Sequence, residues 1–309
     1  MSLLKRRQFL QLAGASSLVL LGGQSAFAKA GGHVVIIGGG FGGATAAKYL
    51  HRLAPDLKVT LIEANKSYIT CPGSNWVIGG IRKMSDITHS YKPLTKQGVK
   101  VIHDTVTVIN PEKKEIGLKG GKSLSYDRLI VSPGIDLKWG AIEGYDEAAS
   151  ELCPHAWKAG PQTDLLVKQL KAMPDDGTFV MAIPGDPYRC PPGPYERASM
   201  VAHYCKQHKP KAKIVLLDAK ANFSKEKLFK AGWTKLYGDM ISWKGQSEDG
   251  KVLRVDPKTK TAYTEFGEYK ADVLNVIPPQ QAGLIARDTG LADDKGWCPV
   301  NPRTFESTK

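Results

Sequence analysis

A nine-residue loop in the middle of the chain gathers side chains suited to redox chemistry. Cys190 supplies a thiol and Glu196 a carboxylate within the run Arg189-Cys190-Pro191-Pro192-Gly193-Pro194-Tyr195-Glu196-Arg197. A thiol just before a helix N-terminus and between two guanidinium groups is expected to form a stabilised thiolate. We therefore predict that Cys190 is a reactive thiol and that Glu196 accepts a proton from it or from its substrate. The alternative is a structural cysteine, with Glu196 serving only the helix dipole.

The elements around this loop follow the order of a dinucleotide-binding fold. Residues 178–184 are an apolar run typical of a buried strand, residues 198–206 favour a helix, and residues 213–218 favour a second strand. The loop between them contains no G-x-G-x-x-G pattern. Its prolines remove amide donors and block the close approach that a pyrophosphate needs. The pattern predicts a thiol site in place of a nucleotide site, and so no use of NADH or NADPH.

A complete dinucleotide fingerprint lies near the front of the chain. Gly38, Gly40 and Gly43 satisfy G-x-G-x-x-G between an apolar strand at 34–37 and a helix at 44–50. Glu63 ends the next strand, about 20 residues after the last glycine, where an acid binds ribose hydroxyls. These residues predict a site for the ADP half of a dinucleotide. The motif alone does not separate FAD from NAD.

Two such units in 309 residues predict an α/β protein with two Rossmann-like three-layer domains. We expect a signal peptide at 1–28, the first part of a cofactor-binding domain at 29–143, and a second Rossmann-like domain with the cysteine loop at 144–279. Residues 280–309 would begin a return to the first domain.

The N-terminus has the features of a twin-arginine export signal. Arg6-Arg7 precedes an apolar region, and Ala26-Phe27-Ala28 forms a small-x-small cleavage site. This predicts a mature start near Lys29 and a periplasmic location. The alternative is a basic amphipathic N-terminus without that function. No stretch is long enough to span a membrane.

Composition narrows the range of partners. The net charge is +13, but the basic residues are dispersed, which favours a solvated surface or an acidic protein partner over nucleic acid. The five cysteines include no C-x-x-C pair, and the histidines show no metal-ligand spacing. We therefore expect neither a c-type haem nor a metal site in this chain.

The chain closely resembles the flavoprotein subunit of flavocytochrome c sulfide dehydrogenase, within the flavoprotein disulfide reductases. The resemblance rests on the glycine fingerprint, the cysteine loop and several shorter stretches: Tyr68–Cys71 with Ser74-Asn75, 154–160, Ile277-Pro278-Pro279-Gln280 and Gly296-Trp297-Cys298-Pro299-Val300. It implies FAD as cofactor, with its ADP half on Gly38, Gly40, Gly43 and Glu63. Cys71 would form a thioether to the flavin 8-methyl carbon.

The resemblance also implies an activity. Cys190 would be half of a redox-active disulfide, hydrogen sulfide would be oxidised to polysulfide or elemental sulfur, and electrons would pass singly to a dihaem cytochrome c subunit. Family members continue beyond the position of Lys309, with a second redox cysteine and a C-terminal interface domain. We therefore expect this chain to be truncated at its C-terminus and to lack that interface domain. Pro72-Gly73 after Cys71 departs from the family pattern.

Two alternatives remain open. A sulfide:quinone oxidoreductase-like enzyme shares the fold and the thiol chemistry but needs a membrane-docking segment, which is not visible in the sequence. A non-catalytic, truncated flavin-binding remnant would keep the first fingerprint without activity.

Overall fold

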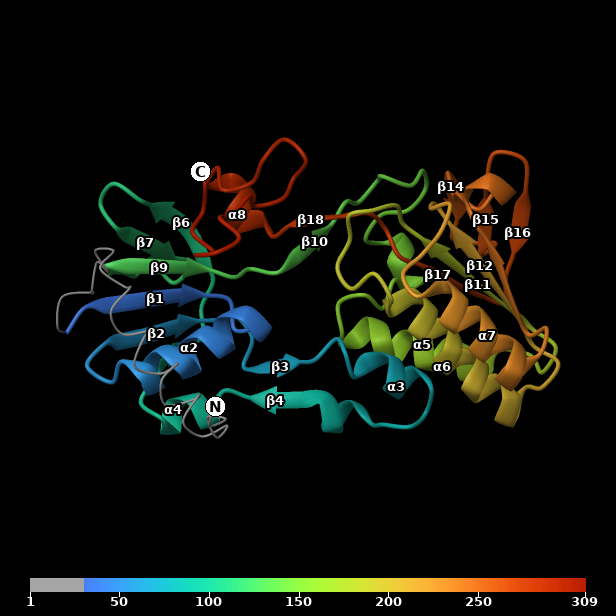
Figure 1. Ribbon diagram of the computed structural model, residues 1–309, viewed down its shortest axis with the longest axis horizontal. Helices are drawn as coiled ribbons and strands as arrows, with labels where there is room; N and C mark the ends of the chain where they lie inside the picture. Colours follow the sequence, from blue (N-terminus) through green and yellow to red (C-terminus); the bar gives the residue numbers. More distant parts are fainter. Residues whose placement is uncertain (1–30) are drawn as a thin grey trace, which may run out of the picture.

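The computed structural model describes residues 31–309, which form two α/β units side by side along the long axis of the molecule (Figure 1). The predicted export signal at 1–28 and the predicted mature start near Lys29 lie outside the described residues. Within residues 31–309, the structure contains no helix with the length and apolar character needed to cross a membrane.

The first unit is built on a parallel sheet with strand order β5-β2-β1-β9. Its strands are β1 (His33–Ile37), β2 (Lys58–Ile62), β5 (Lys100–Ile102) and β9 (Arg128–Val131). Helices α2 (Phe41–Leu53) and α4 (Lys92–Lys96) cover one face, where Val34 and Ile36 pack. An antiparallel sheet, β6 (Val106–Asn110), β7 (Glu115–Leu118) and β8 (Ser123–Ser125), covers the other face, where Val35 and Ile37 pack. Burial on both faces explains why residues 34–37 of β1 are all apolar.

The second unit repeats this plan. Its parallel sheet has the order β13-β12-β11-β17: β13 (Ile241–Lys244), β12 (Lys213–Asp218), β11 (Thr178–Ile183) and β17 (Val273–Val276). One face packs against α5 (Pro161–Ala172), α6 (Gly193–His208) and α7 (Glu226–Tyr237). The other face packs against an antiparallel sheet: β14 (Arg254–Asp256), β15 (Thr261–Tyr263) and β16 (Glu268–Lys270).

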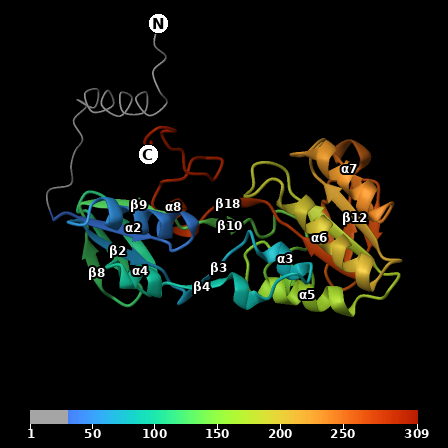
Figure 2. The same ribbon diagram turned by 60° about the horizontal axis from the view of Figure 1, so that its bottom comes forward.

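Two antiparallel ribbons run between the units. β3 (Ser67–Ile69) and β4 (Thr88–Ser90) extend from the first unit and carry α3 (Ser74–Ile78), which packs on α5 and α6 of the second unit (Figures 1 and 2). β10 (Ile135–Leu137) pairs with β18 (Gln280–Ala282), and α8 (Leu284–Asp288) then packs against β6. The first ribbon therefore brings a segment of the first half of the chain against helix α6.

The predicted fold class is confirmed, since both units are three-layered and have parallel four-stranded sheets. The third layer of each unit is an antiparallel sheet rather than helices. The contact of α3 with the second unit also means that the units do not divide at one point of the sequence.

Candidate active site

The turn between β1 and α2 requires glycine at two of the predicted positions. Gly38 has a φ of +92°, and a Cβ there would lie 2.2 Å from the carbonyl oxygen of Ser132. A Cβ on Gly43 would lie 1.8 Å from the carbonyl oxygen of Gly38. Helix α2 begins after Gly40 with no side-chain cap and no acidic residue in its first turn. Its N-terminal amides are therefore free to bind a phosphate.

Glu63 lies beside this turn, immediately after β2. Its Oε2 accepts a hydrogen bond from the Gly39 N–H at 2.8 Å, and its Oε1 accepts one from the Asn65 N–H at 2.8 Å. The structure thus brings Gly38, Gly40, Gly43 and Glu63 together in the arrangement that binds the ADP half of a dinucleotide. These residues fit that part of FAD.

A cavity of about 180 Å³ lies where α3 and the cysteine loop meet. Cys71, Cys190 and Glu196 all line it. Its remaining lining residues are Phe41, Tyr68, Pro72, Ser74, Asn75, Trp157, Arg189, Gly193 and Arg197. Phe41 is also the first residue of α2, so the cavity adjoins the phosphate-binding end of that helix. A dinucleotide bound at the first fingerprint would extend toward both cysteines.

The cysteine loop is shaped for contacts between side chains. Cys190 has a φ of +63°, a left-handed conformation that is uncommon for a residue with a Cβ. A Cβ on Gly193 would lie 2.8 Å from the indole ring of Trp157 and 3.2 Å from the Cys190 Sγ. Gly193 therefore leaves room for an indole and a thiol, and not for the pyrophosphate that a fingerprint glycine admits.

The prediction that the Cys190 thiolate is stabilised is wrong. Desolvation of its sulfur, followed by the charge of Glu196, raises the pKa of the Cys190 thiol. The Gly193 N–H and the Arg189 guanidinium lower that pKa but do not reverse the shift. The thiol form is therefore favoured, and Cys190 needs a neighbouring base to become a nucleophile.

Cys71 lies beside Trp157, and both residues line the cavity. Its thiol donates to the Trp157 carbonyl oxygen at 3.6 Å, and the Arg189 guanidinium donates to the same oxygen. The indole Nε1–H of Trp157 is buried and has no hydrogen-bond partner among residues 31–309. An orphaned donor in a buried side chain calls for an acceptor. A flavin ring, which carries carbonyl oxygens and ring nitrogens, fits that requirement.

Sequence reasoning did not find how Asn75 and Arg197 organise the cavity, and it used Arg197 only as one of the two guanidinium groups that flank Cys190. The Arg197 side chain is 1% exposed and donates to the carbonyl oxygens of His155 and Ala156 and to the side chains of Asn75 and Asn275. Burial lowers the pKa of the Arg197 guanidinium to about 10, so it stays charged at neutral pH. Asn75 and Arg197 both fall within stretches that carry the family resemblance. That resemblance was the sequence feature that could have identified them as site residues.

The equivalent nucleotide crevice of the second unit is occupied by the protein itself. Asp218, at the end of β12, stands where an acid would bind a ribose. It is buried, and it accepts four hydrogen bonds: from Tyr195 Oη at 2.6 Å, Trp243 Nε1 at 3.0 Å, Lys220 Nζ at 2.7 Å and the Lys220 N–H at 3.1 Å. No acceptor capacity is left facing a ligand.

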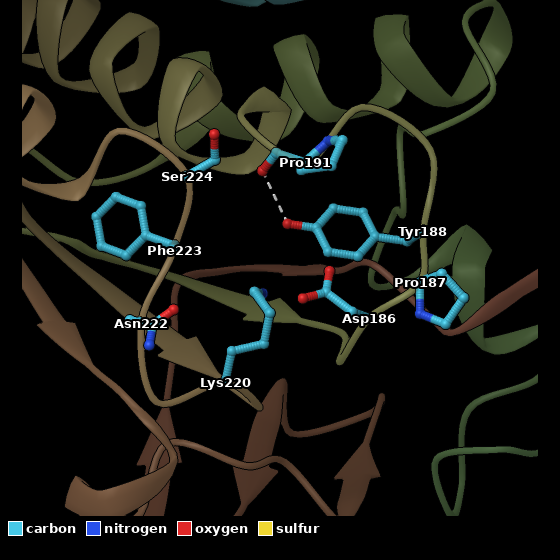
Figure 3. Close-up of a pocket in the computed structure, with 8 residues that line it drawn as sticks. All are labelled: Asp186, Pro187, Tyr188, Pro191, Lys220, Asn222, Phe223 and Ser224. Carbon is cyan, nitrogen blue, oxygen red and sulfur yellow. Dashed lines mark hydrogen bonds between the residues drawn. The ribbon is translucent and has the colours of Figure 1, made fainter.

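An open cavity of about 350 Å³ remains beside this crevice (Figure 3). Its walls come from the two loops that follow β11 and β12 (Asp186, Pro187, Tyr188, Pro191, Lys220, Asn222, Phe223 and Ser224). The Tyr188 hydroxyl donates to the Pro191 carbonyl oxygen at 2.8 Å and closes one side (Figure 3). The proline-containing loop offers no row of amides like that of a phosphate-binding turn.

The other cysteines lie apart from this chemistry. Cys153 and Cys205 are buried, and burial raises the pKa of Cys205 to about 11 and that of Cys153 to about 12. Cys298 is exposed. Within the described part of the chain, no group of three or more His, Cys, Asp or Glu side chains could hold a metal ion.

Two family models match consecutive parts of the chain. A model for the central part of the sulfide dehydrogenase (flavocytochrome c) flavoprotein chain matches residues 163–278. A model for pyridine nucleotide-disulphide oxidoreductases matches residues 32–162. The boundary between the matches falls close to the start of α5.

Individual relatives agree with these matches. The sulfide dehydrogenase (flavocytochrome c) flavoprotein chain of Chlorobaculum thiosulfatiphilum is 57% identical over 44 residues, which are 14% of this chain and 92% of the relative. The sulfide-quinone reductase of Aquifex aeolicus is 35% identical over 175 residues, 56% of this chain and 39% of the relative. The mitochondrial sulfide:quinone oxidoreductase of Dictyostelium discoideum is 24% identical over 287 residues, 89% of this chain and 62% of the relative. The chain thus spans less than two thirds of both sulfide:quinone relatives.

The fold agrees with solved structures. The X-ray structure of the sulfide:quinone oxidoreductase from Aquifex aeolicus superimposes with a TM-score of 0.71 at 23% identity, over 86% of this chain and 63% of that one. A NAD-dependent persulfide reductase from A. fulgidus superimposes with a TM-score of 0.68 at 18% identity, over 90% of this chain and 51% of that one.

Proposed function

We propose a function for this chain on the premise that it belongs to the flavocytochrome c sulfide dehydrogenase flavoprotein family, within the pyridine nucleotide-disulphide oxidoreductases. It oxidises sulfide to polysulfide or elemental sulfur with FAD, and it passes electrons one at a time to a dihaem cytochrome c subunit. One observation carries the proposal: Cys71, Cys190 and Glu196 line a single cavity that adjoins a dinucleotide-binding turn.

The dinucleotide-binding turn and the cavity would each hold one end of FAD. Gly38, Gly40, Gly43 and Glu63 would bind its ADP half, and Cys71 would hold the flavin through a thioether to the 8-methyl carbon. Phe41 and Tyr68, whose rings meet edge to face at 5.6 Å, would flank it in the cavity. When bound, FAD accepts an electron pair and releases single electrons, the conversion that a haem partner requires.

Cys190 would be this chain's half of a redox-active disulfide. Attack by hydrosulfide on that disulfide breaks the S–S bond, leaves a persulfide on one sulfur and releases the other as a thiolate. The released thiolate carries the electron pair that sulfide has lost. Glu196 accepts the proton of hydrogen sulfide, because its carboxylate lies at the same cavity. The Arg189 and Arg197 charges favour an anionic substrate there.

We also propose that the chain acts in the periplasm after twin-arginine export. Arg6→Lys with Arg7→Lys should leave the chain in the cytoplasm, whereas the unchanged chain should start near Lys29. N-terminal sequencing of the periplasmic fraction measures both outcomes, and a periplasmic chain that retains Met1 would contradict the proposal.

An anaerobic sulfide titration tests the proposed activity. In a protein that also supplies the partner cysteine of Cys190, sulfide should bleach the absorbance of the bound flavin, and Cys190→Ser should abolish this bleaching while FAD stays bound. Unchanged bleaching in Cys190→Ser would overturn the role of the thiol. Re-oxidation of the sulfide-reduced protein by a dihaem cytochrome c, compared with a soluble quinone, then identifies the electron acceptor. Faster oxidation by the quinone would favour the reaction named for the Aquifex and Dictyostelium relatives.

A further inference from the structure

The cavity contains an amide that links a buried cation to the proposed base. The Asn75 Oδ1 accepts a hydrogen bond from Arg197 Nε at 3.1 Å, while its Nδ2 donates to Glu196 Oε2 at 2.9 Å. Nδ2 also donates to the Gly193 carbonyl oxygen at 3.3 Å. Asn75 is only 5% exposed, so water does not compete for these contacts. Both amide hydrogens and the amide oxygen are therefore engaged.

The orientation of this amide follows from the chemistry of its partners. A guanidinium can only donate, so the group that faces Arg197 must be Oδ1. An ionised carboxylate can only accept, so the group that faces Glu196 must be the Nδ2 amide. Rotation of the side-chain amide by 180° would place donors against Arg197 and an acceptor against Glu196. Arg197 therefore fixes which side of Asn75 meets the carboxylate.

Arg197 itself is held in place by neutral groups. Its Nη1 donates to the His155 carbonyl oxygen at 2.9 Å and to Asn275 Oδ1 at 3.0 Å, and its Nη2 donates to the Ala156 carbonyl oxygen at 2.6 Å. None of the ion pairs found among residues 31–309 includes Arg197. No carboxylate therefore competes with Asn75 for the guanidinium. The guanidinium also lies over the Trp157 ring, 5.1 Å from its centroid. A buried cation held by carbonyl oxygens, amide oxygens and an indole ring is a rigid reference point for the amide.

The hydrogen bond between Asn75 and Glu196 joins a segment of the first unit to the second unit. Asn75 belongs to α3, which follows Cys71 and is carried by the β3–β4 ribbon of the first unit. Glu196 and Cys190 belong to the second unit, at the start of α6 and in the loop before it. The base is thus held by the segment that carries the proposed flavin-binding cysteine.

We propose that Asn75 is a positioning residue that holds the Glu196 carboxylate beside the Cys190 thiol, with its amide orientation fixed by Arg197. The inference rests on the proposed function, in which Glu196 is the base. Without the Nδ2 contact, the half-buried Glu196 side chain is free to turn toward solvent and away from the thiol. Asn75 does not touch the reacting sulfur in this scheme and acts through Glu196. The Arg197 charge favours an anionic substrate, and its effect on the base passes through Asn75.

The pH profile of Cys190 alkylation tests this proposal without sulfide or flavin. The reduced full-length chain is treated with iodoacetamide across a pH series, and modification of the Cys190 peptide is quantified by mass spectrometry. Because the Glu196 charge raises the pKa of Cys190, Glu196→Gln should move the midpoint of the profile to lower pH. Asn75→Leu should move it in the same direction, and the double variant should move it no further than Glu196→Gln alone.

Asn275→Leu is the matched control. It removes a fully buried amide oxygen from the same guanidinium, but no hydrogen bond joins Asn275 to Glu196 in the described part of the chain. Its midpoint should stay at the wild-type value. If a leucine variant does not fold, Asn75→Ser and Asn275→Ser make the same comparison.

Two results overturn the proposal. An unchanged midpoint in Asn75→Leu, alongside a shifted one in Glu196→Gln, would make Asn75 a structural partner of Arg197 alone. An unchanged midpoint in Glu196→Gln would remove the carboxylate from the environment of the thiol. Failure of the proposed sulfide oxidation would instead appear as absent flavin bleaching in the protein that also supplies the partner cysteine of Cys190, with the alkylation shifts intact.

Discussion

Cys71 and Arg189 donate hydrogen bonds to the same acceptor, the carbonyl oxygen of Trp157. Cys71 comes from the ribbon of the first unit and Arg189 from the cysteine loop of the second, while Trp157 lies on the segment between β10 and α5. Three distant parts of the chain therefore meet at one backbone atom on the cavity wall. Displacement of any of them would alter the spacing of the two cysteines.

The first prediction concerns the covalent flavin. If Cys71 forms the thioether, acid precipitation of the FAD-loaded protein should leave the flavin on the polypeptide, and intact mass should include it. Cys71→Ala should bind FAD only reversibly, because Gly38, Gly40, Gly43 and Glu63 are unchanged. Cys205→Ala is the control, since Cys205 is buried in α6 and lies outside the cavity lining. A yellow wild-type preparation with the mass of the bare chain would rule out the thioether.

The second prediction concerns nicotinamide nucleotides. Because Asp218 is saturated by Tyr195, Trp243 and Lys220, NADH and NADPH should neither bind measurably nor reduce the flavin. Isothermal titration of the flavin-loaded protein measures binding, and stopped-flow absorbance measures reduction. Rapid bleaching by NADH would show that the second unit keeps a working nucleotide site.

The third prediction concerns Gly193. Gly193→Ala places a Cβ 2.8 Å from the Trp157 ring and should destabilise the fold by about 1–3 kcal/mol. It should also change the alkylation rate of Cys190, whose Sγ lies 3.2 Å from that Cβ. Urea denaturation measures the loss of stability. Gly185→Ala, in the loop before α6 and with nothing within 4 Å of its Cβ, should be nearly neutral. Equal midpoints for the two variants would contradict the steric account.

The fourth prediction concerns acid stability. Burial, followed by the charge of Arg197, lowers the pKa of His155 to about 3, and its Nδ1 accepts the Trp157 N–H at 2.8 Å. The unfolded chain therefore takes up this proton first, near pH 6.5. The stability contributed by neutral His155 is present above pH 6.5 and is lost as the pH falls toward 3. By pH 4 the loss is about 3 kcal/mol.

Denaturant midpoints between pH 7 and pH 4 measure this loss. His155→Asn is the matched variant, because an Asn Oδ1 can accept the Trp157 N–H without titrating. Its stability should fall less steeply with acid than that of the wild type. Parallel curves for the two proteins would mean that His155 is not a source of the acid sensitivity.

The regular parts of both units could be predicted from local patterns. The predicted strands at 34–37, 178–184 and 213–218 correspond to β1, β11 and β12, because buried parallel strands carry continuous apolar runs. The predicted helix at 198–206 lies within α6, which begins earlier, at Gly193. A proline is compatible with the first turn of a helix, so Pro194 did not delay its start.

The joining segments could not be predicted in this way. α3 spans only the five residues Ser74–Ile78, and β3 and β4 span three residues each, so none of them has a detectable period. The position of α3 depends on contacts with α5 and α6, which are distant in the sequence. The roles of Asn75 and Arg197 were hidden for the same reason, since their partners come from both units. The ionisation of Cys190 was misjudged because flanking arginines are visible in a sequence, whereas desolvation is not.

The environment of Asp218 has a consequence for protein engineering. A designer who wished to drive this flavoprotein with a nicotinamide would gain nothing from a new glycine-rich turn alone. Tyr195 and Trp243 would still donate to the only acid at the end of β12, and Tyr195 also stacks on Phe223 at 3.7 Å in the core beneath α6. Freeing the carboxylate would open a hole in that core, so the turn, the aromatic residues and the packing would have to be redesigned together.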